Sequence, residues 1–411
     1  MIRFFCIISF LIIAVSSVFS QSSDVIIIDL VNPQEEIIPM SRFFSDKVEY
    51  VPLEMNEVCP LKTYYITSQS IIGVNPLNSA YLFDRKTGGF IKQISKVGTG
   101  ENEYRRFPIT NYGFDEKNKT LFFHDVNQWK GFDVKGNKKV TKIIMPKYSD
   151  QGLTLPKESG GSARHVNDNS QNISNDWLKG EINNPYPFGN NTYIGYVNNT
   201  TGDVNVKLVI FDKQGQVLKS FPNYQRYGKR TMENPLNEGK FYNYHNTVYF
   251  LELYADTLFA VYPDRLEPHI IFNMGDKKAS YSDVVENQTF KVGRYFVYHV
   301  KETSSYVFFC YIIGSVWVNE SVWVNGYYDK KLKKTYVCKT VDGKAGYLND
   351  IDGLPDFHPL LITNQDEFLG VLSPEDLASI NTNTVSKRGL DLLSQVDKAK
   401  YSPIIVIAKL K

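Results

Sequence analysis

The chain is poor in cysteine and has almost no net charge. Four cysteines among 411 residues exclude a fold built on a framework of disulfides. The 46 lysines and arginines nearly balance 44 aspartates and glutamates, so charge argues against nucleic acid or an anionic membrane as a partner. The sequence also lacks a His-Glu-x-x-His pair, a phosphate-binding Gly-Lys loop and a Cys-x-x-Cys pair, so no catalytic residue and no cofactor is predicted.

Only one long apolar run is present, and it lies at the N-terminus over residues 4–14. This run is too short to span a bilayer, so residues 1–20 are predicted to be a secretory signal peptide, cleaved near Ser20, and no transmembrane segment is expected. No cysteine follows the cleavage point closely, so no lipid anchor is expected. We therefore expect one exported domain over residues 21–411, in the periplasm, at the cell surface or secreted.

Three cysteines remain after this cleavage: Cys59, Cys310 and Cys338. An odd and sparse count does not indicate a disulfide framework. Cys310 and Cys338 lie in apolar segments and are predicted to be buried thiols, with a bridge between them as the alternative.

A repeated sequence pattern is the strongest indication of the fold. An apolar run ends in Asp, a polar turn carries Gly, and a second apolar run follows, as in Tyr81–Asp84 with Gly88 and in Val209–Asp212 with Gly215. Asp at the start of a type I turn accepts hydrogen bonds from the turn, and Gly accepts the positive φ that closes the hairpin. Repeated hairpins, with 27 Tyr and 26 Phe in the chain, predict an all-β repeat architecture.

The whole chain divides into four-stranded units, which predicts a six-bladed β-propeller. The sixth unit is one strand short at the C-terminal end, and residues 48–53 supply that strand, so the two ends of the chain would close the ring in the last blade. The segment 25–30 is expected near the same seam. The predicted strands are 62–67, 70–74, 80–83 and 90–94; 110–114, 121–124, 130–133 and 138–144; one within 146–190, then 192–197, 206–211 and 217–221; 240–244, 248–253, 257–261 and 269–274; 295–301, 306–312, 322–328 and 335–339; and 360–363, 368–372, 404–410 and 48–53.

One helical insertion interrupts the last unit. Ser373 as N-cap, Pro374 at the first position and Asp376 at the third predict a helix start. The helix is expected to run in pieces to about Lys398 and to pack on the outside or the bottom of the ring. Its predicted apolar stripe is Leu377, Ile380, Leu390, Leu393 and Val396.

Several short motifs are familiar: Gly98–Tyr104, Asp350–Gly353, the helix start at Pro374–Leu377 and the last strand at Pro403–Lys411. With them the chain resembles a family of exported bacterial six-bladed β-propellers of unknown function, which are NHL-like and often lipoproteins. The resemblance implies a propeller at or beyond the cell envelope, and it implies no established activity. The chain departs from the family in lacking a lipidation cysteine.

The connections between blades suggest a ligand site at the loop-rich mouth of the channel. Arg offers bidentate donors to carboxylate or sulfate, and Tyr offers a flat face with a polar tip to sugar rings. The alternative is that these charges pair with each other and brace the ring. The candidates are Glu103, Tyr104, Arg105 and Arg106 in one loop, Arg226, Tyr227 and Arg230 in a second, and Asp350 and Asp352 in a third.

A second constellation is formed by His245, His299 and His358, which lie in or beside predicted inner strands. Three imidazoles meeting in the channel would hold a metal; the alternative is that each histidine is structural. Trp317 and Trp323 are likewise either an exposed sugar platform or part of the blade core.

These features favour an exported, monomeric binding module for a glycan, a peptide or a protein. The alternatives are a metal-dependent hydrolase or lyase with a channel site, and a structural component of an envelope assembly.

Overall fold

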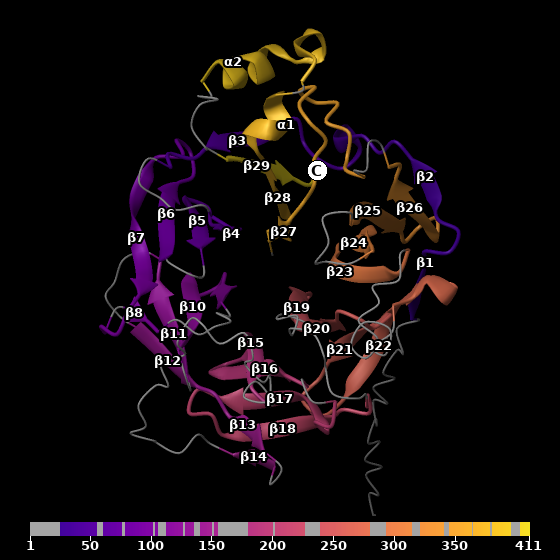
Figure 1. The fold of residues 1–411 in the computed structure, drawn as a ribbon. Helices are drawn as coiled ribbons and strands as arrows, with labels where there is room; N and C mark the ends of the chain where they lie inside the picture. Colours follow the sequence, from indigo (N-terminus) through magenta and orange to yellow (C-terminus); the bar gives the residue numbers. More distant parts are fainter. Residues whose placement is uncertain are drawn as a thin grey trace, which may run out of the picture.

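Six four- and five-stranded sheets surround a common axis, and the protein is a six-bladed β-propeller (Figure 1). A seventh, two-stranded sheet joins β13 (Lys147–Ser149) to β14 (Gly152–Thr154). The computed structural model describes residues 25–55, 61–75, 79–101, 103–105, 112–125, 128–134, 140–149, 152–154, 180–199, 202–226, 239–279, 293–314, 321–340, 345–363, 365–378, 380–395 and 403–411.

The blades confirm the strands that the sequence predicts, and the inner strand of the third blade falls at residues 182–189. In chain order the blades are β4 (Thr63–Ile66), β5 (Ser70–Asn75), β6 (Ser79–Asp84), β7 (Phe90–Val97) and β8 (Glu103–Tyr104); β9 (Tyr112–Asp115), β10 (Thr120–Asp125), β11 (Gln128–Asp133) and β12 (Val140–Ile144); β15 (Ile182–Gly189), β16 (Thr192–Val197), β17 (Val206–Asp212) and β18 (Val217–Pro222); β19 (Gly239–Tyr244), β20 (Thr247–Glu252), β21 (Thr257–Val261) and β22 (Leu266–Asn273); β23 (Tyr295–Glu302), β24 (Tyr306–Ile313), β25 (Val322–Asp329) and β26 (Lys334–Cys338); and β27 (Leu361–Ile362), β28 (Glu367–Leu372), β29 (Ile404–Lys409) and β3 (Glu49–Pro52).

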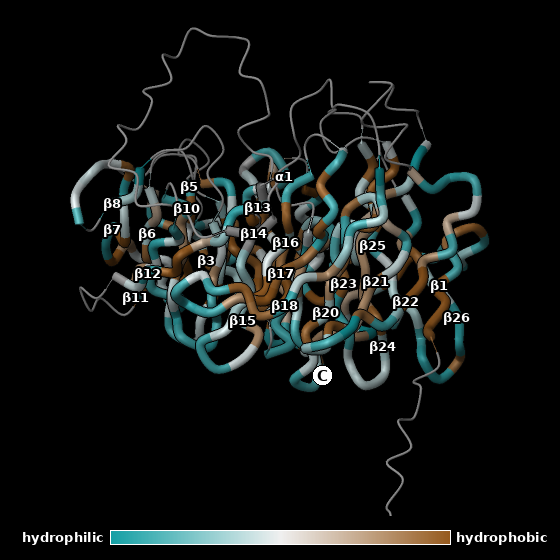
Figure 2. The backbone as a smooth tube through the Cα atoms, turned by 90° about the horizontal axis from the view of Figure 1, so that it is seen from below, coloured by the Kyte–Doolittle hydropathy of each residue, from teal (hydrophilic) through white to brown (hydrophobic). Residues whose placement is uncertain are grey.

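Strand direction divides the molecule into two faces. The four main strands of each blade are antiparallel to their neighbours, so the turns after the first and third strands lie on one face, which we call the hairpin face. The connections after the second and fourth strands lie on the opposite face, which we call the loop face. In the side view, the C-terminus lies at the hairpin face and α1 (Pro374–Ala378) toward the loop face (Figure 2).

The ends of the chain meet in the last blade, as the sequence predicts. β29 pairs with β28 on one side and with β3 on the other, with Ile404 opposite Pro52 and Ile407 opposite Glu49. This blade therefore contains strands from both ends of the chain, and the ring is closed by backbone hydrogen bonds.

Arg85, in the turn after β6, fastens the first blade to the last. Its Nε and Nη2 donate to both carboxylate oxygens of Glu49 at 2.9 and 2.7 Å, and its Nη2 also donates to Glu367 at 2.8 Å. A guanidinium is suited to this geometry because its planar fork satisfies two carboxylates at once. Both Arg85 and Glu367 are only 9% exposed, so the contact is a buried one at the hairpin face of the seam.

Gly88, in the same turn, lies directly on the closing strand. Its φ of +74° needs the left-handed region, and a Cβ there would lie 1.8 Å from the Pro52 carbonyl oxygen. The turn chemistry is as predicted, because Asp84 Oδ1 accepts from the backbone N–H of Lys86 and of Thr87.

The N-terminal segment corrects one prediction. Residues 25–30 do not lie at the seam of the last blade: β1 (Ile26–Asp29) pairs in parallel with β22 at the rim of the fourth blade. β2 (Gln34–Glu36) then pairs in parallel with β26 at the rim of the fifth. The chain thus follows two successive rims before it forms the third as β3 (Figure 1), and it covers two outer edges that would otherwise expose unpaired backbone groups.

The helical insertion forms α1, a 3-10 turn over Thr382–Thr384 and α2 (Lys387–Gln395). The predicted cap is confirmed: the Ser373 hydroxyl accepts from the Asp376 N–H, and Asp376 accepts from the Ser373 N–H. The insertion lies outside the last blade, and α1 lies toward the loop face rather than the bottom of the ring (Figures 1 and 2). Within α2 the stripe differs from the prediction, since Leu392 is buried and Leu390 is 42% exposed; Val396 and Lys398 lie outside the described residues.

Cys310 and Cys338 are buried free thiols, as the sequence predicts, and no bridge joins them. Burial raises the pKa of the Cys310 thiol to about 12. Cys59 lies outside the described residues.

Candidate ligand site at the axis

The first predicted loop is held by contacts of its own. Tyr104 is fully buried, with its ring stacked on Phe123 at 4.0 Å between centroids. Glu103 accepts from the Gly100 N–H, which with the Lys96 ion pair lowers the pKa of Glu103. The Arg105 Nε donates to Asp125 at 2.9 Å, although the Arg105 side chain remains 44% exposed. Arg106 lies outside the described residues.

The second loop is braced in a similar way. Arg226 Nη1 donates to the carbonyl oxygens of Asn223 at 2.8 Å and of Val204 at 3.2 Å. Tyr224 beside it is 85% exposed at the loop face. Tyr227 and Arg230 lie outside the described residues.

The third loop connects the fifth blade to the last. Asp350 accepts from the backbone N–H of Ser41 at 2.9 Å, so it ties this loop to the N-terminal segment. Asp352 is 2% exposed and forms an ion pair with Arg388 of α2. Burial opposes ionisation of Asp352, but hydrogen bonds from Arg388 and Ser386 outweigh it and hold its pKa below the usual value.

The charged candidates therefore serve as braces in the part of the chain that the structure describes. No ion pair joins Glu103, Arg105 or Arg226 to Asp350 or Asp352 there. The sequence does not reveal these partners: Ser41 lies about 300 residues from Asp350, and Asp125 stands at the end of a buried strand.

The three histidines do not come together. His245 lies in the turn after β19 at the hairpin face, with φ +48°, whereas His358 precedes β27 and packs against Gly346 at the loop face. Among the described residues, no three His, Cys, Asp or Glu side chains are grouped to hold a metal. Only His299 lies at the axis, and burial, with a smaller effect from Lys240, lowers its pKa to about 4.

The axis carries an aromatic group that the sequence interpretation missed. Burial raises the pKa of Tyr65 on β4, and smaller contributions come from Tyr112 on β9 and Tyr298 on β23. β4, β9 and β23 are the first strands of the first, second and fifth blades, and these inner strands face the common axis (Figure 1). The Tyr112 hydroxyl is also hydrogen-bonded to Thr63 of the first blade.

A bulge brings Tyr298 and its neighbours into this group. The pairing of β23 with β24 shifts between Val297 and His299, which re-aims the side chains at this point. The Lys240 ammonium lies 4.3 Å from the centroid of the Tyr298 ring. The Trp323 ring packs edge-on against the same Tyr298 ring, with 4.7 Å between the two centroids. Trp317 lies outside the described residues.

We define the axial cluster as the partly exposed side chains of Tyr65, Tyr112, Lys240, Tyr298 and His299 on inner strands, with Trp323 of the third strand β25 in contact with Tyr298. The sequence signal for it was at least one tyrosine in the first strand of each of the first five blades. That signal was used only as evidence for strands, because side-chain alternation alone does not show which residues reach the axis.

The two ends of the axis differ in charge. At the hairpin face the charges are paired: Lys301 Nζ lies 2.9 Å from the Thr363 carbonyl oxygen and 3.7 Å from Asp366. Glu302 is hydrogen-bonded to His269 at 2.7 Å and to Lys330 at 2.6 Å. Lys240, by contrast, has no carboxylate within 4.0 Å among the residues described.

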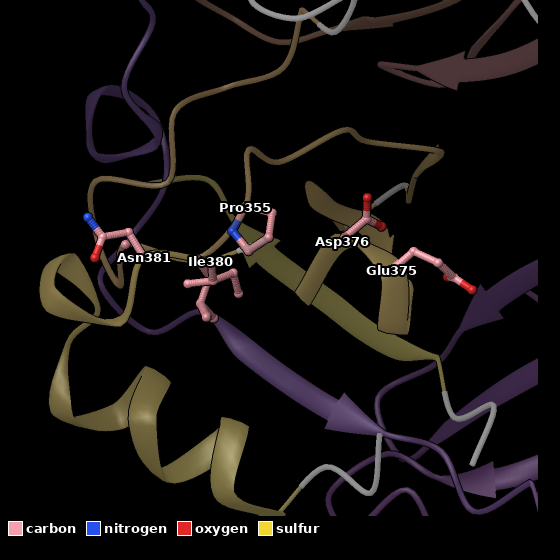
Figure 3. A pocket seen from close by; sticks show the side chains of 7 residues that line it. Pro355, Glu375, Asp376, Ile380 and Asn381 are labelled. Atoms are coloured by element: carbon pink, nitrogen blue, oxygen red, sulfur yellow. The ribbon is translucent and has the colours of Figure 1, made fainter. Parts of the chain in front are cut away.

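A small cavity of about 330 Å³ lies between the third loop and the helical insertion, lined by Gly353, Leu354, Pro355, Glu375, Asp376, Ile380 and Asn381 (Figure 3). Asp376 is committed to the helix cap. The Glu375 side chain points away from Pro355 and Ile380. The polar and apolar groups of this cavity therefore do not converge on one ligand position.

None of the helices in the described segments is both long and apolar enough to cross a bilayer. Over residues 25–409 the chain matches the family described as "Domain of unknown function (DUF4934)", and it belongs to that family. A comparison with curated proteins finds no match.

Two solved structures share the fold. One is a "Putative exported protein" from Bacteroides fragilis, with a TM-score of 0.63 and 14% identity over 94% of this chain and 99% of that one. The other is a member of the DUF4221 family from Bacteroides vulgatus, with a TM-score of 0.52 and 11% identity over 90% of this chain and 98% of that one. The protein is thus a propeller of a family without known function, a fold that suggests a binding or structural module; the fold itself selects no ligand.

Proposed function

We propose that the protein is a binding module that recognises a glycan at the loop side of its axis. The observation that carries this proposal is the axial cluster, in which Lys240 lies over the Tyr298 ring, and Tyr65 and Tyr112 belong to the inner strands of the first and second blades. Tyr and Trp combine an apolar ring with a polar tip, which suits a pyranose with its apolar faces and hydroxyl edges. A rigid ring of six blades supports these side chains, so little ordering is needed on binding.

The loop face supplies the surroundings of this site. Arg105 remains 44% exposed there while one nitrogen braces Asp125, and Tyr224 is 85% exposed. These two side chains are proposed to contact the outer part of a longer ligand, as the sequence interpretation expected of the mouth. A metal-dependent reaction at His245, His299 and His358 is not supported, because His245 and His358 lie on opposite faces.

Export is part of the same proposal. The N-terminal pattern of residues 1–20 fits a signal peptide, and the Bacteroides fragilis relative is called exported. Intact mass of the protein recovered from its native host should show cleavage near Ser20. A chain that retains its first 20 residues would contradict this part of the proposal.

Glycan-array binding followed by calorimetry tests the function. Tyr298→Ala and Tyr65→Ala should weaken binding about 10-fold or more, since a lost aromatic contact is worth about 1 kcal/mol or more. Phe90→Ala is the matched control, because Phe90 is a 47% exposed ring on the outer strand β7. Binding of a peptide or protein in place of any glycan, or loss of binding only in the control, would overturn the proposal.

A further inference from the structure

We propose that the glycan bound at the axial cluster is anionic, with a carboxylate or sulfate group placed against the Lys240 ammonium. This inference rests on the proposed function and names its ligand class. It is carried by the position of Lys240, by the donors around it and by the distribution of charge along the axis.

Lys240 is held against an aromatic ring. It is the second residue of β19, and its ammonium lies over the Tyr298 ring at 4.3 Å from the centroid. Within the described part of the chain no carboxylate lies within 4.0 Å of it, whereas Lys301 and Lys330 near the hairpin face each contact an acid. A partly buried lysine without an acid is uncommon in a folded protein, and a cation held on a ring can receive an anion from solvent.

The groups around Lys240 are donors. Burial raises the pKa of Tyr65 and of Tyr112, so both phenols stay neutral at physiological pH and can donate a hydrogen bond, as the Tyr298 hydroxyl also can. His299 is neutral as well, so it offers one N–H without adding a second charge. One cation with several neutral donors is a set that fits carboxylate or sulfate oxygens.

The distribution of charge along the axis favours one end for an anionic ligand. Glu302 and Asp366 lie at the hairpin end. Burial raises the pKa of Tyr244 there, and these two carboxylates raise it further. Lys330 and Lys301 pair with these two acids, so they offer an anion less attraction than Lys240 does at the other end. The tilted rings of Tyr298 and Trp323, 65° apart, place flat apolar surfaces beside the cation, which favours a sugar ring over an acidic peptide.

Calorimetry with defined oligosaccharides tests this inference. The probes are hexagalacturonate, a sulfated galactan hexasaccharide without uronate, neutral galactohexaose, maltohexaose and hexaglutamate. The variants are Lys240→Gln, Lys240→Arg and, as a matched control, Lys117→Gln, since Lys117 is exposed in a turn of the hairpin face.

At least one of the two acidic oligosaccharides should bind, more tightly than the neutral sugars, and the acid that binds identifies the anion. Lys240→Gln should weaken that binding about 10- to 100-fold, as expected for a charge-assisted hydrogen bond, while Lys240→Arg retains most of it and Lys117→Gln all of it. Added salt should weaken binding of the acidic sugar to the wild type more than to Lys240→Gln.

Two results would overturn the inference and leave the proposed function standing: preference for the neutral hexasaccharides, or acidic binding that Lys240→Gln does not change. Preference for hexaglutamate would replace the glycan with an acidic peptide. If no oligosaccharide binds, the inference and the proposed function both fail.

Discussion

The two ends of the propeller axis use the same residue types for different purposes. At the hairpin face, Arg85, Lys301 and Lys330 each contact a carboxylate, and Arg85 spans the seam between the first and last blades. Toward the loop face, Lys240 lies over the Tyr298 ring, and no carboxylate of the described residues is within 4.0 Å of it. The difference separates residues that hold the ring closed from the residues at which we propose a ligand binds.

The largest expected effect is on the seam. Arg85→Met should lower the free energy of unfolding by about 3–5 kcal/mol, because it leaves the buried Glu367 without its partner. Urea unfolding measures the change. Arg265→Met is the control, since Arg265 forms exposed ion pairs with Asp264 and Glu267 and should leave stability unchanged. Equal effects of the two substitutions would show that the seam does not depend on Arg85.

A smaller loss of stability is expected from Gly88→Ala. Its Cβ would collide with the Pro52 carbonyl oxygen of the closing strand, whereas Gly293 has a similar φ of +85° and nothing within 4 Å. Gly293→Ala should therefore cost only the strain of the left-handed region, about 1–2 kcal/mol, and Gly88→Ala distinctly more. Matching midpoints for the two variants in urea would contradict closure by β3.

The pH dependence of stability sharpens the hairpin side of the comparison. Burial opposes ionisation of Glu302, but hydrogen bonds from His269 and Lys330 lower its pKa below the usual value. A depressed pKa stabilises the fold above the unfolded value of about 4.3, and that stabilisation is lost as pH falls through the lower folded value. The stability difference between wild type and Glu302→Gln should therefore shrink from pH 6 to pH 3. A constant difference across this range would contradict the assignment.

The smallest expected effect on stability is at the axial cluster. Lys240→Gln removes no ion pair among the described residues, so its melting temperature should lie within about 2 °C of the wild type. Thermal unfolding without ligand checks this. A large drop would assign Lys240 to the structure of the ring, as for Arg85, and would remove the contrast between the two ends.

The hairpins and the N-terminal strand β1 show which parts of the fold the sequence could predict and which it could not. Strands and turns followed from local signals, such as Asp84 and Gly88 in one hairpin. The place of residues 25–30 did not, because parallel pairing with β22 depends on a partner more than 200 residues away.

The candidate site was predictable only in part. Loop residues such as Asp350 and Asp352 were found as a cluster, but their partners Ser41 and Arg388 belong to other elements, so bracing was visible only in the structure. The axial tyrosines lay in strands that were correctly predicted. Which of their side chains meet depends on how blades face each other and on the bulge at Tyr298, and neither is written in strand periodicity.

The most direct measurement is a crystal structure of the protein soaked with hexagalacturonate and, in parallel, with the sulfated galactan hexasaccharide. The account predicts an acidic group at about 3 Å from the Lys240 ammonium, with a sugar ring against Tyr298 or Trp323. An oligosaccharide bound instead at the hairpin face or on an outer rim, with the axial cluster unchanged, would contradict it.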